Sequence, residues 1–112
     1  MSECLFCWIL KKEIPSKPVY EDESLYAFRD INPQAPTHVL VIPKKHVEGV
    51  AELEKGDAEF VGKLILGARQ IARDLGVKSY RLVFNHGSES GQSVFHLHLH
   101  LMGGRRMAWP PG

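Results

Sequence analysis

The chain of 112 residues suits a single domain over residues 1–112, because a compact domain of this size buries well over half of its unfolded surface without disulfides. No apolar run approaches the roughly 18 residues that a membrane helix needs, so we expect no membrane partner. The 14 basic and 13 acidic side chains nearly cancel, and short pairs such as Arg105-Arg106 are typical of solvated surface, which argues against a nucleic-acid polymer as partner. The start lacks the basic segment of a signal peptide, so we expect a cytoplasmic protein.

In chain order, apolar residues at helical spacing predict a short helix over residues 4–12 and one long amphipathic helix over residues 56–76, which Asp57 caps and Gly76 ends. Segments of β-type composition predict five strands: 19–21, 24–30, 38–43, 79–84 and 94–102. Residues 31–36 and 85–93 are loops, and residues 103–112 form an extended tail. Because a loop without a helix joins the last two strands, we predict an α+β domain with an antiparallel sheet.

Three histidines alternate with apolar residues near the end of the chain. Side chains of a strand alternate between its faces, so His96, His98 and His100 point one way. The residues between them are predicted to point into the core: Phe95, Leu97, Leu99 and Leu101. Such a row fits metal binding or nucleophilic attack on phosphorus. Three parallel imidazoles on a straight strand converge poorly on one zinc ion, which favours phosphorus chemistry.

Two further features carry chemistry. The loop residues Gly91, Gln92 and Ser93 directly precede the histidine row, and exposed N–H groups in such a loop form a cradle for phosphate. Cys4 and Cys7 are spaced C-x-x-C, which is too local to staple a fold and indicates metal or redox chemistry in a cytoplasmic chain.

The H-x-H-x-H motif with apolar intervening residues resembles the histidine-triad family, and specifically its Hint branch of nucleoside phosphoramidases. The resemblance covers nearly the whole chain: Leu5-Phe6, AFRDI at 27–31, PQAPTH at 33–38, VIPKKH at 41–46, Asn85, GQSV at 91–94 and WPPG at 109–112. It implies a five-stranded antiparallel sheet with two helices. It also implies a homodimer formed through the long helix and a strand edge.

The resemblance implies these site residues. His98 is the nucleophile, His100 holds the phosphate, His38 supports the pocket and Ser93 assists the leaving group. Asn85, Gly91 and Gln92 hold phosphate oxygens, and the carboxylate of Asp30 receives the ribose hydroxyls. The purine base lies in an apolar pocket formed by Leu5, Phe6, Ile9, Phe28, Ile31 and Leu40. Trp109 reaches the active site of the partner subunit.

The implied reaction is hydrolysis of a purine nucleoside phosphoramidate through a nucleotidyl-histidine, with no cofactor required for catalysis. A zinc-binding, bacterial-type subset of the family also resembles this chain, and the corresponding ligands are Cys4, Cys7, His46 and His96. That zinc would be structural and remote from His98, so chelation would at most loosen the fold.

Three other functions remain open. The chain is alternatively a dinucleoside polyphosphate hydrolase that uses the same His98 chemistry. It is alternatively a nucleotide-binding or zinc-binding interaction module with incidental activity. A hydrolase with catalytic zinc in the histidine row is the third alternative, and it predicts that chelation abolishes activity.

Overall fold

The computed structural model, which describes residues 4–112, is an α+β fold built on a five-stranded antiparallel sheet. The strands are β1 (Pro18–Glu21), β2 (Leu25–Arg29), β3 (Thr37–Pro43), β4 (Tyr80–Val83) and β5 (Leu99–Gly103). Their order across the sheet is β1-β2-β3-β5-β4, and every neighbouring pair is antiparallel. The predicted fold class and five-stranded sheet are therefore confirmed.

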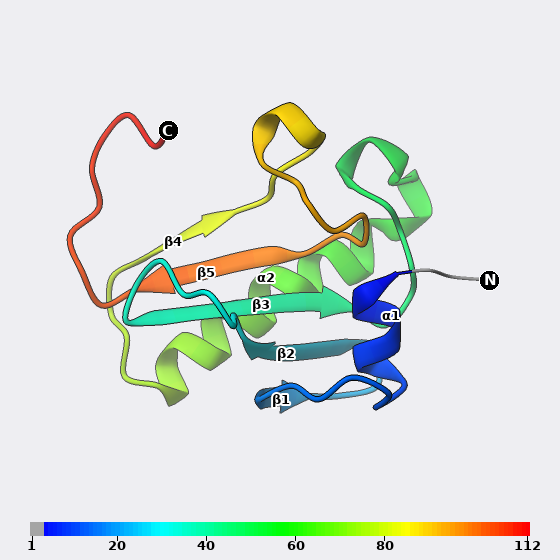
Figure 1. Ribbon diagram of the computed structural model, residues 1–112, viewed down its shortest axis with the longest axis horizontal. Coiled ribbons are helices and arrows are strands. Elements are labelled where there is room, and N and C mark those ends of the chain that lie inside the picture. The colour runs from blue at the N-terminus through cyan, green and yellow to red at the C-terminus, as the bar shows by residue number, and fades with distance from the viewer. Residues whose placement is uncertain (1–3) are drawn as a thin grey trace.

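One helix covers each face of the sheet (Figure 1). The long helix α2 (Ala58–Asp74) lies across one face, and the short helix α1 (Leu5–Leu10) lies against the other. The central strand β3 is buried on both sides, which suits its run of β-branched residues. Val39 and Val41 pack with α2, whereas Leu40 and Ile42 pack beneath α1. These two apolar layers hold the sheet in place.

Both predicted helices exist but are shorter than expected. Asp57 does not cap α2 through its side chain. Instead its Oδ2 accepts the backbone N–H of Glu54 at 2.9 Å in a preceding short 3₁₀ turn, and its Oδ1 binds Lys45. Gly76 has a φ of 73° just after α2, so the predicted glycine stop is confirmed. Neither helix is long and apolar enough to cross a membrane, as holds for every helix within residues 4–112.

The last strand begins at Leu99, so the predicted start at residue 94 is wrong. Residues 94–98 cross beneath the loop that follows β3, and the backbone N–H of Leu97 donates to the carbonyl of Val47 at 2.7 Å instead of pairing in the sheet. Leu97, Leu99 and Leu101 are buried as predicted. Phe95 is 45% exposed and outside the core, because strict alternation of faces does not extend into this irregular segment.

Candidate active site and the adjoining metal centre

His98 and His100 lie at the entrance to β5, with ring centroids 4.9 Å apart. The Nδ1 atom of His98 lies 2.8 Å from the main-chain oxygen of His96. Because a carbonyl oxygen only accepts hydrogen bonds, this Nδ1 carries the proton, and neutral His98 keeps its lone pair on Nε2. His98 therefore presents a nucleophilic nitrogen on a ring whose orientation the backbone fixes.

A chain of hydrogen bonds assigns the tautomers of the other two histidines. The backbone N–H of Gln34 donates to Nδ1 of His38 at 3.0 Å, so Nε2 of neutral His38 carries the proton. That Nε2 donates to Nδ1 of His100 at 2.9 Å, and it lies 3.4 Å from Oδ2 of Asp30. His100 consequently bears its proton on Nε2, where it is a hydrogen-bond donor suited to a phosphoryl oxygen. Sequence reasoning missed Gln34, because its backbone N–H makes this contact.

Burial keeps these imidazoles neutral. It lowers the pKa of His98 below the ordinary 6.5, and it lowers the pKa of His100 to about 4, with further lowering from His98 and His38 whenever those rings become protonated. Burial also lowers the pKa of His38, against an opposing effect of the Asp30 carboxylate. At neutral pH the lone pair on His98 is therefore available for attack, and the tautomers assigned above persist.

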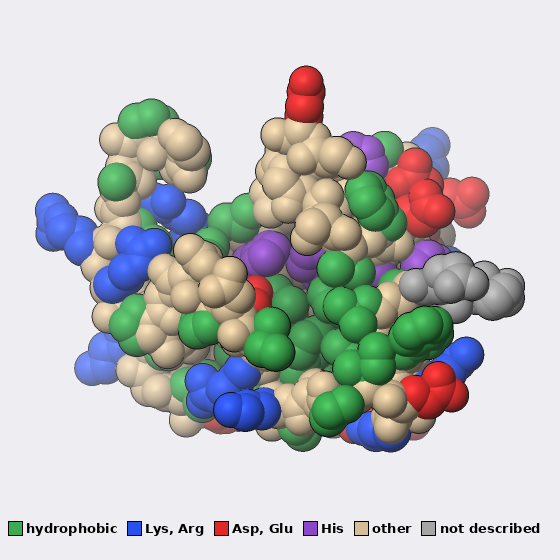
Figure 2. Space-filling model, viewed as in Figure 1, with side chains coloured by type: hydrophobic (Ala, Val, Ile, Leu, Met, Phe, Trp, Pro, Cys, Tyr) green, Lys and Arg blue, Asp and Glu red, His purple; other side chains and the backbone are tan. Residues whose placement is uncertain are grey.

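Histidine side chains lie at the bottom of a hollow on the α1 side of the sheet (Figure 2). Of the predicted base-pocket residues, Phe6, Ile9, Phe28 and Leu40 belong to one buried cluster under α1, and the ring of Phe6 meets that of His98 edge-on at 5.1 Å. The other predicted apolar contacts are more exposed. Leu5 is 43% exposed, Trp109 83% and Ile31 fully. The half-buried Asp30 lies beside His38, and its Oδ2 is 3.4 Å from Nε2 of that ring.

The predicted phosphate loop is held mainly by Gln92. Its amide nitrogen donates to the carbonyls of Glu48 and Val94 at 2.7 and 3.2 Å, and its amide oxygen accepts from the backbone N–H of Gly87. Gln92 therefore braces the loop in this conformation, and its side-chain donors are already used. Gly91 has a φ of 103°, which requires glycine at this turn. Asn85 is half-buried below Gly91, and Ser93 is exposed at the end of the loop.

The four predicted zinc ligands do come together at one end of α1. Nδ1 of His96 lies 3.5 Å from Sγ of Cys4 and 3.6 Å from Sγ of Cys7. Nδ1 of His46 lies 3.3 Å from Sγ of Cys7 and 3.1 Å from Nδ1 of His96. A zinc tetrahedron with ordinary bond lengths has sulfur–nitrogen edges of about 3.6 Å and nitrogen–nitrogen edges of about 3.3 Å. The cluster thus has the size and the donor set of a Cys2His2 zinc site.

Protonation within the cluster also fits a metal. Nε2 of His96 lies 2.8 Å from the carbonyl oxygen of Pro43, so it carries the proton and leaves Nδ1 bare toward the cysteines. Burial raises the pKa of the Cys4 thiol, and the neighbouring Cys7 raises it further. A bound cation would reverse this effect by stabilising the thiolates.

The cluster adjoins His98, contrary to the expected remote position. His96 contributes its ring to the cluster and its carbonyl oxygen to His98. Phe6, which lies between the two cysteines in the sequence, packs edge-on against the rings of both His96 and His98. Any change in the cluster therefore reaches His98 through two direct contacts.

A second group, formed by Asp30, His38 and His100, also has its ligand atoms within 4.8 Å of one another. The tautomers argue against a metal there, because Nε2 of His38 carries a proton and its Nδ1 already accepts from Gln34. This group is better described as a proton-bearing relay.

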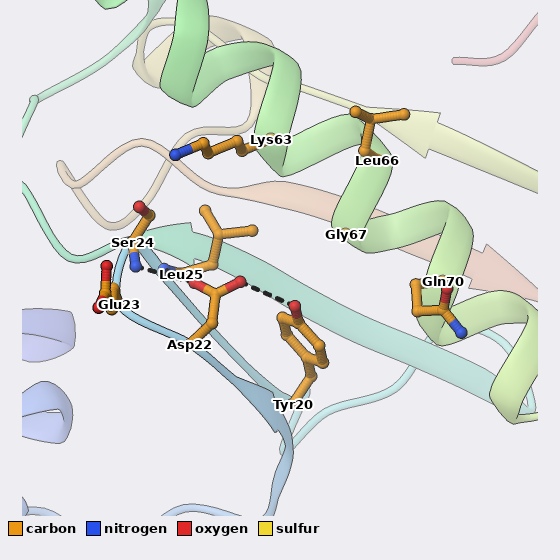
Figure 3. A pocket seen from close by; sticks show the side chains of 9 residues that line it. All are labelled: Tyr20, Asp22, Glu23, Ser24, Leu25, Lys63, Leu66, Gly67 and Gln70. Carbon is orange, nitrogen blue, oxygen red and sulfur yellow. Dashed lines mark hydrogen bonds between the residues drawn. The ribbon is translucent and has the colours of Figure 1, made fainter.

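A shallow cavity of about 500 Å³ lies between α2 and the turn that joins β1 to β2 (Figure 3). Asp22 points into it but already accepts from Tyr20 and from the backbone of Ser24 and Leu25. No histidine or cysteine lines this cavity, so it offers no comparable chemistry.

Known proteins share the sequence and the fold of this chain. The HIT domain family matches residues 11–107. A 14 kDa zinc-binding protein from Zea mays is 52% identical over 99% of this chain and 89% of its own length. A HIT family hydrolase from Legionella pneumophila superposes with a TM-score of 0.96 and is 50% identical, covering 98% of this chain and 100% of that one. Another, from Clostridium thermocellum, superposes with a TM-score of 0.93 at 47% identity and covers 96% of each chain. The chain belongs to the HIT family.

Proposed function

We propose that this protein is a nucleotide hydrolase in which Nε2 of His98 attacks phosphorus. One observation carries the proposal: the hydrogen bond from Nδ1 of His98 to the carbonyl of His96, which leaves the opposite nitrogen bare and oriented. The names of the relatives support hydrolysis, since two of the similar structures are called HIT family hydrolases.

The preferred substrate is a purine nucleoside phosphoramidate. Nε2 of His98 forms a bond to phosphorus while the phosphorus–nitrogen bond to the amine breaks, and the amine departs with a proton taken from solvent. Water then attacks the nucleotidyl-histidine and gives up a proton to solvent, which releases the nucleoside monophosphate and regenerates neutral His98. In both steps Nε2–H of His100 donates to the phosphoryl oxygen on which negative charge develops. Ser93 assists the leaving amine, and Asp30 accepts the ribose hydroxyls.

Cys4, Cys7, His46 and His96 hold a structural zinc in this proposal. Their spacing supports it, and so does the name of the Zea mays relative, a zinc-binding protein. When bound, zinc supplies a crosslink between α1 and the segment that leads into β5. We also infer that the protein is a cytoplasmic homodimer that binds no membrane or nucleic-acid polymer.

Intact-protein mass after rapid quenching tests the proposal. Wild type mixed with adenosine 5′-phosphoramidate should show a transient nucleotidyl adduct, and His98→Ala should show neither adduct nor turnover. His86→Ala, which removes an exposed histidine, should behave as wild type. Rapid turnover by His98→Ala would remove His98 as the nucleophile.

The same assay distinguishes the alternatives. Faster hydrolysis of diadenosine polyphosphates than of the phosphoramidate would assign a polyphosphate hydrolase. Nucleotide binding by wild type without adduct or turnover of either compound would favour an interaction module.

A further inference from the structure

A second pocket opens on the catalytic face of the sheet, where the C-terminal tail leaves β5. It has a volume of about 470 Å³ and is lined by Ser79, Tyr80, Arg81, Arg105, Arg106 and Met107. From the sequence, Arg105 and Arg106 are typical of solvated surface. The structure instead gathers them with Arg81, which comes from a different strand.

The charges of these three arginines are not balanced by acidic neighbours. No aspartate or glutamate lines the pocket, and none of the ion pairs within residues 4–112 includes any of the three. Arg81 donates to the carbonyl of Ala108 at 2.8 Å, and Arg105 donates to the carbonyls of Gln34 and Arg106 at 2.9 Å. These bonds orient two guanidinium groups and leave their charge available to an anion.

Arg106 differs from the other two. Its guanidinium has no hydrogen-bond or ion-pair partner in the part of the chain that the structure describes. All of its donors are therefore available to an incoming oxyanion, and removal of the guanidinium breaks no internal hydrogen bond or ion pair.

Strand register places the pocket beside the catalytic histidines. Met102 of β5 lies opposite both Arg81 of β4 and His38 of β3, and directly opposed residues share a face of the sheet. His100 is the diagonal neighbour of Arg81, at a distance of about 7–8 Å between backbones. Basic side chains gather on the side of the histidine hollow nearest the tail (Figure 2).

The loop that precedes β3 and fixes the ring of His38 also contacts the pocket. Arg105 binds the carbonyl of Gln34, and the N–H of the same residue fixes the tautomer of His38. The wall of the arginine pocket is thus continuous with the phosphate-handling relay.

We propose that Arg81, Arg105 and Arg106 form a subsite for an oxyanion, a carboxylate or a phosphate, on the leaving group of the substrate. This rests on the proposed function, which places the scissile phosphorus at His98 and His100. The leaving group then extends along the catalytic face toward the tail. Guanidinium groups bind both oxyanions through paired N–H donors, which is why the subsite accepts either source.

Matched adenosine 5′-phosphoramidates test the subsite. One pair carries alanine or neutral alaninamide as the leaving amine, and the other carries 2-aminoethyl phosphate or neutral ethanolamine. Wild type should show a higher kcat/KM for the charged member of at least one pair, and Arg106→Gln should reduce that preference about fivefold to tenfold. Its kcat/KM for the neutral compounds should stay unchanged. Lys78→Gln, an exposed charge outside the pocket lining, should keep the wild-type preference.

Binding separates failure of the subsite from failure of the proposed function. Affinities of the same compounds for His98→Ala, with and without Arg106→Gln, are measured by calorimetry. Tighter binding of a charged member that Arg106→Gln abolishes supports the subsite, even if wild type hydrolyses none of the compounds. Equal affinity for charged and neutral members, or an equal effect of Arg106→Gln on both, overturns it. The pair that shows the preference identifies the oxyanion as carboxylate or phosphate.

Discussion

The chemistry of this site depends on backbone groups that hold single imidazoles in one tautomer. The carbonyl of His96 fixes His98, and the N–H of Gln34 fixes His38 and, through it, His100. All three rings must be neutral. A protonated His98 would have no lone pair to attack phosphorus, and a protonated His38 or His100 would have none to accept its hydrogen bond. Residues with lowered pKa values are therefore expected at the centre of the site.

His100 should make stability depend on pH. Its pKa of about 4 in the folded protein lies below the ordinary 6.5, so between these values the unfolded chain binds more protons. Stability is thus fully present above pH 6.5 and is lost as pH falls toward 4. From pH 7.5 to 5, this residue should lower the free energy of unfolding by about 1–2 kcal/mol.

Urea unfolding of wild type and His100→Asn across this pH range measures the effect. The variant should lose part of the slope, whereas His86→Asn, which changes an exposed histidine, should keep the wild-type slope. An unchanged slope in His100→Asn would contradict burial of a neutral His100.

The sequence predicted which histidines come together better than it predicted the backbone groups that orient them. His38, His98 and His100 form a recognisable pattern together with the loop before them, and the structure brings all three into one hydrogen-bonded group. Gln34 could not be predicted, because a backbone N–H is common to every residue except proline. Arg81 could not be predicted either, since only strand pairing brings it to the tail.

Among the elements, the short helix α1 contacts both the apolar core under the sheet and the Cys/His cluster. Six residues are too few for a stable isolated helix, so α1 depends on tertiary contacts. Two sets of tertiary contacts hold it: Phe6 and Ile9 pack against the sheet, and the two cysteines lie against His46 and His96. Element boundaries were the weaker part of the sequence prediction. The irregular segment before β5 has strand-like composition, but its hydrogen bonds go to the loop after β3.

Cys7→Ser should affect both α1 and the nucleophile. We expect loss of zinc from the protein, a lower unfolding temperature and a kcat for the phosphoramidate reduced about tenfold, because ligand-sphere changes typically cost activity on this scale. The reduction follows from weaker positioning of His96 and Phe6, which both contact His98. Metal analysis, thermal unfolding and steady-state kinetics measure the three effects.

Lys11→Ser, at the exposed end of the same helix, is the matched control and should retain zinc and kcat. Complete loss of activity on chelation, with the fold intact, would instead favour catalytic zinc. A zinc-free Cys7→Ser protein with wild-type kcat would show that packing alone positions His98.

At the scale of the whole molecule, one side of the fold lacks apolar cover. The outermost strand β4 leaves one edge unpaired in the sheet, and α2 exposes Ile65 by 44%. Leu82 of β4 is 37% exposed and shares its sheet face with the buried Leu101 opposite, which is the face that α2 covers. An uncovered strand edge beside exposed apolar side chains is typical of an interface between subunits.

Ile65→Lys should therefore convert a dimer into a monomer. In the proposed homodimer a second copy covers this apolar side and extends the sheet, so wild type should sediment at about twice the 12.6 kDa chain mass. A lysine buried without a partner charge in that interface would oppose the association. Gln70→Lys adds the same charge on another exposed flank of α2 and should remain dimeric.

Since Trp109 is 83% exposed and is predicted to reach the partner's active site, the monomer should also lose activity. A monomeric wild type would contradict the dimer, and full activity in monomeric Ile65→Lys would restrict catalysis to residues of a single chain.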